Sequence, residues 1–109
     1  MSLNYDYKRM LIVDLEATCW EDATNRAEQN TKNEIIQIGI VEINLAKKMI
    51  TKEACYFVKP TLNPILSDFC TNLTGIKQSD VDQAHSLMKV SKIIRKEFSP
   101  LKIVWGAWG

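Results

Sequence analysis

Two acidic residues, Asp14 and Glu16, interrupt an otherwise apolar run over residues 11–19, "LIVDLEATC". Successive side chains of a β-strand point to opposite faces, so these carboxylates share one face, roughly 7 Å apart along the strand. Two like charges side by side in a buried strand need a cation between them, because unpaired buried carboxylates are costly. Oxygen ligands favour Mg²⁺ or Mn²⁺. We therefore predict a metal site; the alternative is a strand end with solvated acids.

Composition describes one ordinary globular domain. The chain has 109 residues, of which 46% are hydrophobic and 25% charged, and its formal net charge is +1. This near-neutral charge gives no global attraction for nucleic acid, so any such function must come from a local site. No apolar run reaches the ~20 residues of a membrane helix, and the N-terminus lacks a signal-peptide pattern. These two absences predict a cytoplasmic protein without membrane association. Because Cys19, Cys55 and Cys70 form no CxxC pair, we expect them to be reduced thiols.

Four segments have the apolar and β-branched content of strands. The first is expected to be central, and the second alternates Ile36, Ile38 and Ile40 with another apolar set, which indicates an internal strand. A short polar connection makes the second and third strands an antiparallel hairpin. The polar stretch between Cys19 and Asn33 is predicted to be a loop. The predicted strands cover residues 10–16, 34–44, 51–58 and 102–108.

Two helices are predicted between the third and fourth strands. The first begins at Asn63, an N-cap followed by proline, and ends at Gly75. The second begins after a Ser86 cap, carries one apolar stripe, and ends at Ser99, which precedes a proline. A helical crossover of this length lets the last strand return parallel to the first.

The order of these elements predicts an α/β fold with a mixed sheet: three antiparallel strands, then helices, then a strand parallel to the first. We assign residues 1–109 to the N-terminal portion of a single domain, with residues 1–8 as a leader. A fourth strand that ends the chain would leave an apolar face bare. We therefore expect the natural domain to continue past Gly109, which makes the predicted fold truncated after its fourth strand.

Four segments, in this order and spacing, resemble DEDDh-type 3′-5′ exonucleases of the ribonuclease H-like fold. They are "LIVDLEATC", "NEIIQIGIVEIN", "FVKPTLNPILSDFCTNLTGIKQSDVDQA" and "VWGAWG". Within that superfamily the likeness is to the branch of histone-mRNA 3′ exonucleases and bacterial sporulation-inhibitor proteins of the KapD type. It runs from about Lys8 to the last residue.

The resemblance implies a metal-dependent exonuclease that removes 5′-mononucleotides from the 3′ ends of single-stranded RNA or DNA. Asp14 and Glu16 match the family's first motif, whose carboxylates bind two divalent cations, Mg²⁺ or Mn²⁺, roughly 4 Å apart. The residues just after the Glu, here Ala17 and Thr18, would hold the terminal ribose. The segment that packs against the terminal base would be Leu73, Thr74, Gly75 and Ile76.

Several positions keep two interpretations. Residues 73–76 also fit a plain helix C-terminus with a glycine cap. Trp105 and Trp108 fit core packing as well as a place near bound substrate. Glu34 fits a solvated strand end as well as a role in orienting the site, and His85 is more typical of a surface or capping residue than of a ligand.

By the same resemblance, the remaining catalytic residues would lie beyond Gly109: a second-motif Asp, then a third-motif His and Asp. His85, the only histidine, does not match the general-base position. We therefore expect the 109-residue chain to be inactive alone. The alternative function is a non-catalytic nucleic-acid-binding or regulatory interaction domain of the same fold, and the sequence leaves the oligomeric state open.

Overall fold

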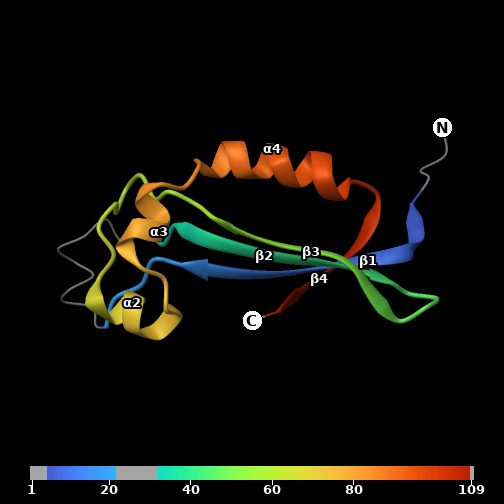
Figure 1. Ribbon diagram of the computed structural model, residues 1–109, viewed down its shortest axis with the longest axis horizontal. Coiled ribbons are helices and arrows are strands. Elements are labelled where there is room, and N and C mark those ends of the chain that lie inside the picture. Colours follow the sequence, from blue (N-terminus) through green and yellow to red (C-terminus); the bar gives the residue numbers. More distant parts are fainter. Residues whose placement is uncertain (1–4, 22–31, 109) are drawn as a thin grey trace.

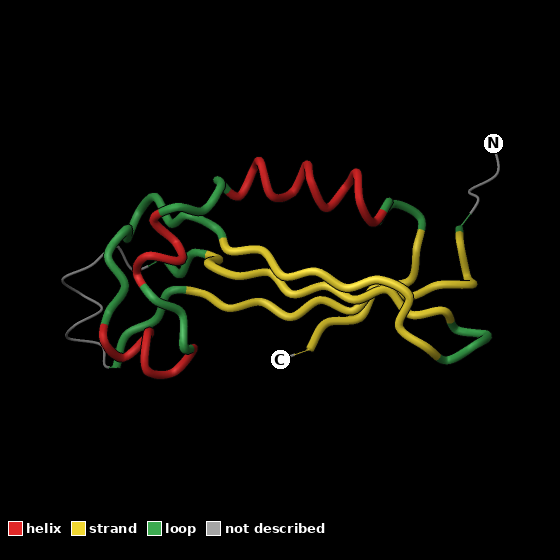
Figure 2. Tube along the Cα trace, in the orientation of Figure 1, coloured by secondary structure: helices red, strands yellow, loops and turns green. Residues whose placement is uncertain are grey.

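The computed structural model describes residues 5–21 and 32–108, so the predicted loop between Cys19 and Asn33 lies largely outside the described residues. Figure 1 and Figure 2 show the arrangement of the described strands and helices. In chain order they are β1 (Asp6–Ala17), β2 (Ile35–Asn44), β3 (Met49–Phe57), α2 (Asp68–Thr74), α3 (Gln78–Asp82), α4 (Leu87–Phe98) and β4 (Ile103–Trp108). None of the described helices is long and apolar enough to cross a membrane.

The strands form one mixed sheet in the order β3-β2-β1-β4. β1 pairs antiparallel with β2 and β2 pairs antiparallel with β3, while β4 lies parallel to β1. The predicted topology and the interior position of the first two strands are confirmed. In Figure 1, α4 runs along one face of the sheet and α2 lies beyond the C-terminal end of β1.

α4 covers its face of the sheet through the apolar stripe that the sequence predicts. Phe98 is 2% exposed and packs with Leu11 and Ile103. Val90 is 1% exposed and packs with Ile38. Because Leu11 and Ile38 point toward α4, the alternate side chains of β1 and β2 point to the opposite face.

Both ends of α4 agree with the predicted ends. The Ser86 hydroxyl accepts the N–H of Lys89 at 3.2 Å, as an N-cap does. Ser99 is the C-cap, with a φ of 44°, and its N–H donates to the carbonyl of Arg95 at 3.2 Å. The proline after Ser99 cannot continue the helix, so the chain turns toward β4 here.

β1 begins at Asp6, ahead of the predicted start at Met10, and so includes residues 6–8 that we assigned to a leader. Arg9 accounts for this longer strand. Its guanidinium forms ion pairs with Asp6 and Glu42 and donates to the carbonyl of Phe98 at 3.2 Å. The first residues of β1 are thereby tied to β2 and to the end of α4.

The predicted start of the first helix at Asn63 is wrong, because α2 begins after a Ser67 N-cap. The N–H of Asn63 donates to the carboxylate of Glu34 at 2.7 Å, and the N–H of Leu66 donates to the side chain of Gln78 at 2.8 Å. These acceptors are distant in sequence and hold the segment in a non-helical path. Local propensity therefore misplaces the helix start.

α3 is absent from the predicted elements and has only 5 residues. Its sequence signal is Asp80, whose carboxylate accepts the N–H of Lys77 at 2.9 Å in a capping box. Val81, 0% exposed, joins α3 to the core cluster that contains Ile36 and Cys70. This cluster packs α2 and α3 against the end of the sheet where β1 terminates.

Candidate active site

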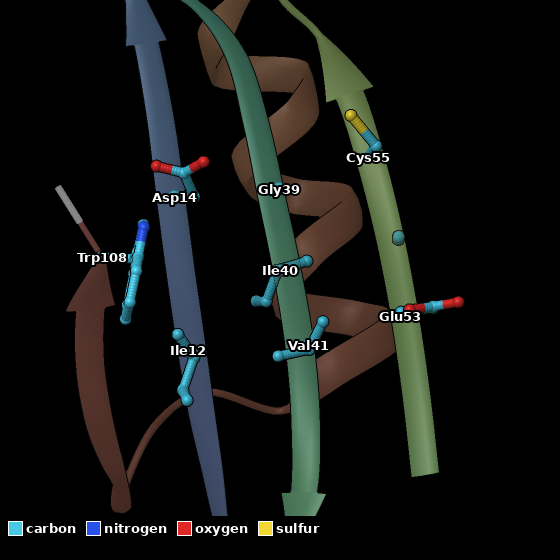
Figure 3. A pocket seen from close by; sticks show the side chains of 9 residues that line it. Ile12, Asp14, Gly39, Ile40, Val41, Glu53, Cys55 and Trp108 are labelled. Atoms are coloured by element: carbon cyan, nitrogen blue, oxygen red, sulfur yellow. The ribbon is translucent and has the colours of Figure 1, made fainter. Parts of the chain in front are cut away.

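Asp14 and Glu16 lie on the face of the sheet opposite α4. Leu11 and Val13 pack against clusters that include residues of α4, so alternation along β1 places the two acidic side chains on the other side. Figure 3 shows Asp14 on β1 among the residues that line a hollow of this face. The two carboxylates therefore share a face, as the strand period requires.

These carboxylates are not buried, contrary to the expectation from the apolar run. Asp14 is exposed and Glu16 is half-buried, because no described element covers this face at their position. Even Leu15, on the helix face, is 48% exposed near the end of the strand. The structure gives neither carboxylate a hydrogen bond or an ion pair within the described part of the chain. The reason to expect a cation here is therefore that two negative charges lie on one face, and not that the carboxylates are buried.

Four residues form a row across the sheet at the level of Asp14. Trp108 pairs with Asp14, Asp14 with Gly39, and Gly39 with Cys55. Since Gly39 has no side chain, the row leaves a hollow of about 540 Å³ that Asp14, Cys55 and Trp108 line (Figure 3). The hollow is also lined by Ile12, Ile40, Val41, Glu53 and Ala54. Asp14 is thus an acidic residue in the lining of a largely apolar hollow.

The donor set fits part of a divalent metal site. Carboxylate oxygens are the ligands that Mg²⁺ and Mn²⁺ prefer, and Asp14 and Glu16 supply them on one face. Among the described residues, no group of three or more His, Cys, Asp or Glu side chains could hold a metal ion. A two-metal centre needs more ligands than these two residues provide. Among the described residues the pair could therefore supply at most some of the ligands of such a centre.

The strand changes register directly after the carboxylate pair. Glu16 pairs with Gln37, whereas Ala17 pairs with Ile35, so a β-bulge lies between Glu16 and Ala17. Bulges are frequent next to active sites, where they redirect side chains. This bulge separates the strand that carries the carboxylates from the turn that follows.

Thr18 faces inward at this turn and is 2% exposed. Its N–H donates to the carbonyl of Glu34 at 2.8 Å, and its hydroxyl accepts the N–H of Glu34 at 2.9 Å. Its carbonyl accepts the side-chain amide of Asn33. These bonds give Thr18 a part in fixing the shape of the turn, beside the half-buried Ala17.

Two thiols lie behind the turn. Burial raises the pKa of Cys19 to about 11, and a hydrogen bond with Cys70 acts in the same direction. Cys19 is therefore a protonated thiol at neutral pH and a poor nucleophile. Cys19, Cys55 and Cys70 form no disulfide in the structure.

Residues 73–76 end α2 and divide into inward and outward side chains. Ile76 is 2% exposed and packs with Cys70, and the Thr74 hydroxyl donates to the carbonyl of Cys70 at 2.8 Å. Gly75 is the C-cap, with a φ of 77° that favours glycine. Leu73, in contrast, is 67% exposed. The segment therefore caps the helix and also presents Leu73 to solvent.

Among the other residues that had two interpretations, the structure places His85 and Trp105 away from Asp14, and Trp108 next to it. His85 is exposed and lines another hollow with Val90 of α4. Trp105 is 46% exposed and donates to the carbonyl of Pro100 at 2.9 Å. Trp108 is 77% exposed and lies beside Asp14. The pairing of β4 with β1 places Trp108, and not Trp105, opposite Asp14. No pattern in the sequence predicts this register.

The model of the exonuclease family RNase T matches residues 11–106 of the chain. ERI1 exoribonuclease 2 of Mus musculus is 43% identical over 77 residues, which are 71% of this chain and 11% of that relative. The 3′-5′ exonuclease eri1 of Schizosaccharomyces pombe is 45% identical over 75 residues, which are 69% of this chain and 24% of that relative. The chain thus spans a quarter or less of the length of these relatives.

Solved structures agree in fold. The nuclease domain of 3′hExo, a DEDDh family member solved with rAMP, has a TM-score of 0.76 and 34% identity, covering 94% of this chain and 52% of that one. Cell-death related nuclease 4 has a TM-score of 0.76 and 27% identity, covering 93% of this chain and 35% of that one. The sheet order and the parallel β1–β4 pair are those of the ribonuclease H-like fold. The family match, the identities and the fold together show that the chain belongs to the RNase T family of exonucleases.

Proposed function

We propose that this chain supplies the first-motif half of a metal-dependent 3′-5′ exonuclease that removes 5′-mononucleotides from single-stranded ends. The observation that carries the proposal is the placement of Asp14 and Glu16 on one exposed face of β1, without an ion pair in the described part of the chain. Because the chain belongs to an exonuclease family, a metal-binding role explains why two carboxylates lie together on this face.

Asp14 and Glu16 would hold the divalent cations, with Mg²⁺ or Mn²⁺ as the ions that carboxylate oxygens favour. Such cations, when bound, activate water and stabilise the charge that develops on the phosphate. The chain itself fixes the ligands. β1 is paired with β2 and with β4 at the level of Asp14, so the backbone that carries this carboxylate is held on both sides.

The terminal nucleotide would bind between the turn at Ala17 and Thr18 and the exposed end of α2. Leu73 offers an apolar contact to a base, and such contacts tolerate any base, as an exonuclease requires. One structural neighbour was solved with rAMP, and another recognises the 3′ end of a histone mRNA stem-loop. These neighbours favour RNA as the substrate.

A second candidate is a non-catalytic nucleic-acid-binding or regulatory module of the same fold. The observation that favours it is the incomplete ligand set: the described residues contain no third metal-binding side chain near the pair. The two candidates differ in what they require, since a binding module has no need of Asp14 and Glu16.

An activity assay with two proteins tests the catalytic proposal. The purified 109-residue chain is expected to release no mononucleotides from a labelled single-stranded RNA in Mn²⁺ or Mg²⁺, because the residues that the structure describes place only Asp14 and Glu16 together as candidate ligands, and a two-metal centre needs more. A chimera, in which this chain replaces the matching segment of the Schizosaccharomyces pombe relative, is expected to degrade the RNA from its 3′ end. A folded but inactive chimera would contradict the catalytic proposal, and turnover by the chain alone would contradict its incompleteness.

Leu73→Ala tests the contact to the base. In the chimera we expect KM for a single-stranded RNA to rise roughly 5-fold, since the lost apolar contact is worth about 1 kcal/mol. Stability should stay within about 0.5 kcal/mol, because Leu73 is 67% exposed. Leu101→Ala is the matched control, since Leu101 is also 67% exposed but lies beside β4. Equal KM values for the two variants would rule out the contact.

A further inference from the structure

The carboxylate of Glu34 gathers four hydrogen bonds from one loop. The N–H groups of Thr61 and Leu62 donate to it at 2.8 Å each, that of Asn63 at 2.7 Å, and the Thr61 hydroxyl at 3.2 Å. Both carboxylate oxygens are used. Three consecutive N–H groups around one anion form an anion-binding concavity, here filled by a side chain of the same chain.

The main chain of Glu34 is tied to the other side of the candidate site. Its carbonyl accepts the N–H of Thr18 at 2.8 Å, and its N–H donates to the Thr18 hydroxyl at 2.9 Å. One residue therefore connects the turn that follows the carboxylate pair with the loop at residues 61–63.

That loop leads directly into α2. The Ser67 hydroxyl donates to the carbonyl of Cys19 at 2.6 Å and accepts the N–H of Cys70 at 3.0 Å. The turn and α2 are thus joined through Glu34, through Ser67 and through the Cys70 thiol, which donates to the carbonyl of Ala17 at 3.7 Å. Of these three residues only Glu34 uses an ionised group, and hydrogen bonds to charged groups are the stronger kind.

Glu34 keeps its charge in this setting. Burial, the largest influence, raises its pKa, but the N–H groups of Leu62, Thr61 and Asn63 together lower the pKa below its ordinary value. A glutamine at this position has the same shape but only one acceptor oxygen, and it turns an NH₂ group toward backbone N–H donors. The substitution would therefore leave at least one donor of the loop without an acceptor.

We infer that Glu34 is a positioning residue, which holds the turn at Thr18 and the loop that leads into α2 at a fixed distance, and so places the helix whose C-terminal end would contact the terminal nucleotide. The inference rests on the proposed function. The hydrogen bonds of Glu34 go to Thr18 and to residues 61–63, and none goes to Asp14 or Glu16. Its loss should therefore weaken substrate binding and spare the metal ligands.

Amide hydrogen exchange of the 109-residue chain tests the coupling without any catalysis. In Glu34→Gln, protection of the amides of residues 61–63 should fall at least about 10-fold, and the amides of Thr18 and Cys70 should lose protection with them. Glu97→Gln, an equal change of charge at the exposed end of α4, should alter none of these amides. Loss confined to residues 61–63 would overturn the coupling.

Kinetics of the chimera test the positioning. Glu34→Gln should raise KM about 10-fold while kcat stays within about 2-fold, the pattern of a residue that places substrate through others. An equal loss in kcat, or no change in KM, would overturn the inference. If the unsubstituted chimera is inactive, the proposed function fails instead, and the exchange experiment still decides whether Glu34 couples the turn to α2.

Discussion

Asp14→Asn in the chimera is expected to lower kcat by at least about 100-fold, with little change in KM. Asn keeps the size of the side chain and leaves the pairing of Asp14 with Gly39 and Trp108 intact. It removes the negative charge and one of the ligand oxygens that a divalent cation requires. The measurement is the rate of mononucleotide release from a labelled single-stranded RNA at saturating Mn²⁺.

The control for Asp14→Asn is Asp82→Asn at the end of α3. Asp82 is exposed and accepts a hydrogen bond from Gln78 at 2.8 Å, which the amide oxygen of Asn can still accept. Glu16→Gln should repeat the loss of kcat, because Glu16 is on the same face of β1. If Asp14→Asn and Asp82→Asn chimeras are equally active, the acidic pair has no catalytic role, and the binding-module alternative is favoured.

Phe98→Ala is expected to cost about 3–5 kcal/mol in the free energy of unfolding, the usual cost of emptying a buried aromatic site. Phe98 is 2% exposed and packs with Leu11, Ile40 and Ile103, and Lys52 lies 5.3 Å from its ring centroid. A domain of this size is stable by about 5–15 kcal/mol, so the variant should be at or near its unfolding threshold. Urea denaturation followed by far-UV circular dichroism measures the loss.

Phe69→Ala is the matched control, with the same change of side chain. Phe69 is 37% exposed on α2, so its replacement should cost less than half as much as that of Phe98. Equal losses would contradict the assignment of Phe98 to the core that joins α4 to the sheet.

The strands could be predicted from local pattern because each is apolar or β-branched for its whole length. The alternation of Ile36, Ile38 and Ile40 correctly indicated a strand inside the sheet, and Ser86 correctly marked the start of α4. The pattern placed the start of β1 too late. Of the two ion pairs of Arg9, the one with Glu42 joins residues far apart in sequence, so no local pattern contains it.

The first helix shows why local signals failed. Asn63 followed by proline is a good helix start by propensity, yet its N–H is used by Glu34, whose contribution depends on the fold. Gln78 acts similarly on Leu66. The side chains of Glu34 and Gln78 come close to these N–H groups only once β2, α2 and α3 have assembled.

The site was only partly predictable. That Asp14 and Glu16 share a face follows from the period of a strand, but their exposure depends on which face α4 covers. The approach of Trp108 to Asp14 depends on the register of a parallel pair, which no local pattern specifies. The role of Glu34 stayed open for the same reason, since the loop that its carboxylate binds is distant in sequence.

The bulge between Glu16 and Ala17 has a consequence for how such a site can diversify. The regular ladder of β1 with β2 is complete at the pair Glu16–Gln37, before the irregularity. Insertions or deletions in the segment after Ala17 can therefore alter the turn without moving the ladder that carries the carboxylates. In the proposed exonuclease, changes in the turn that would contact the 3′ end therefore need not alter the spacing of Asp14 and Glu16.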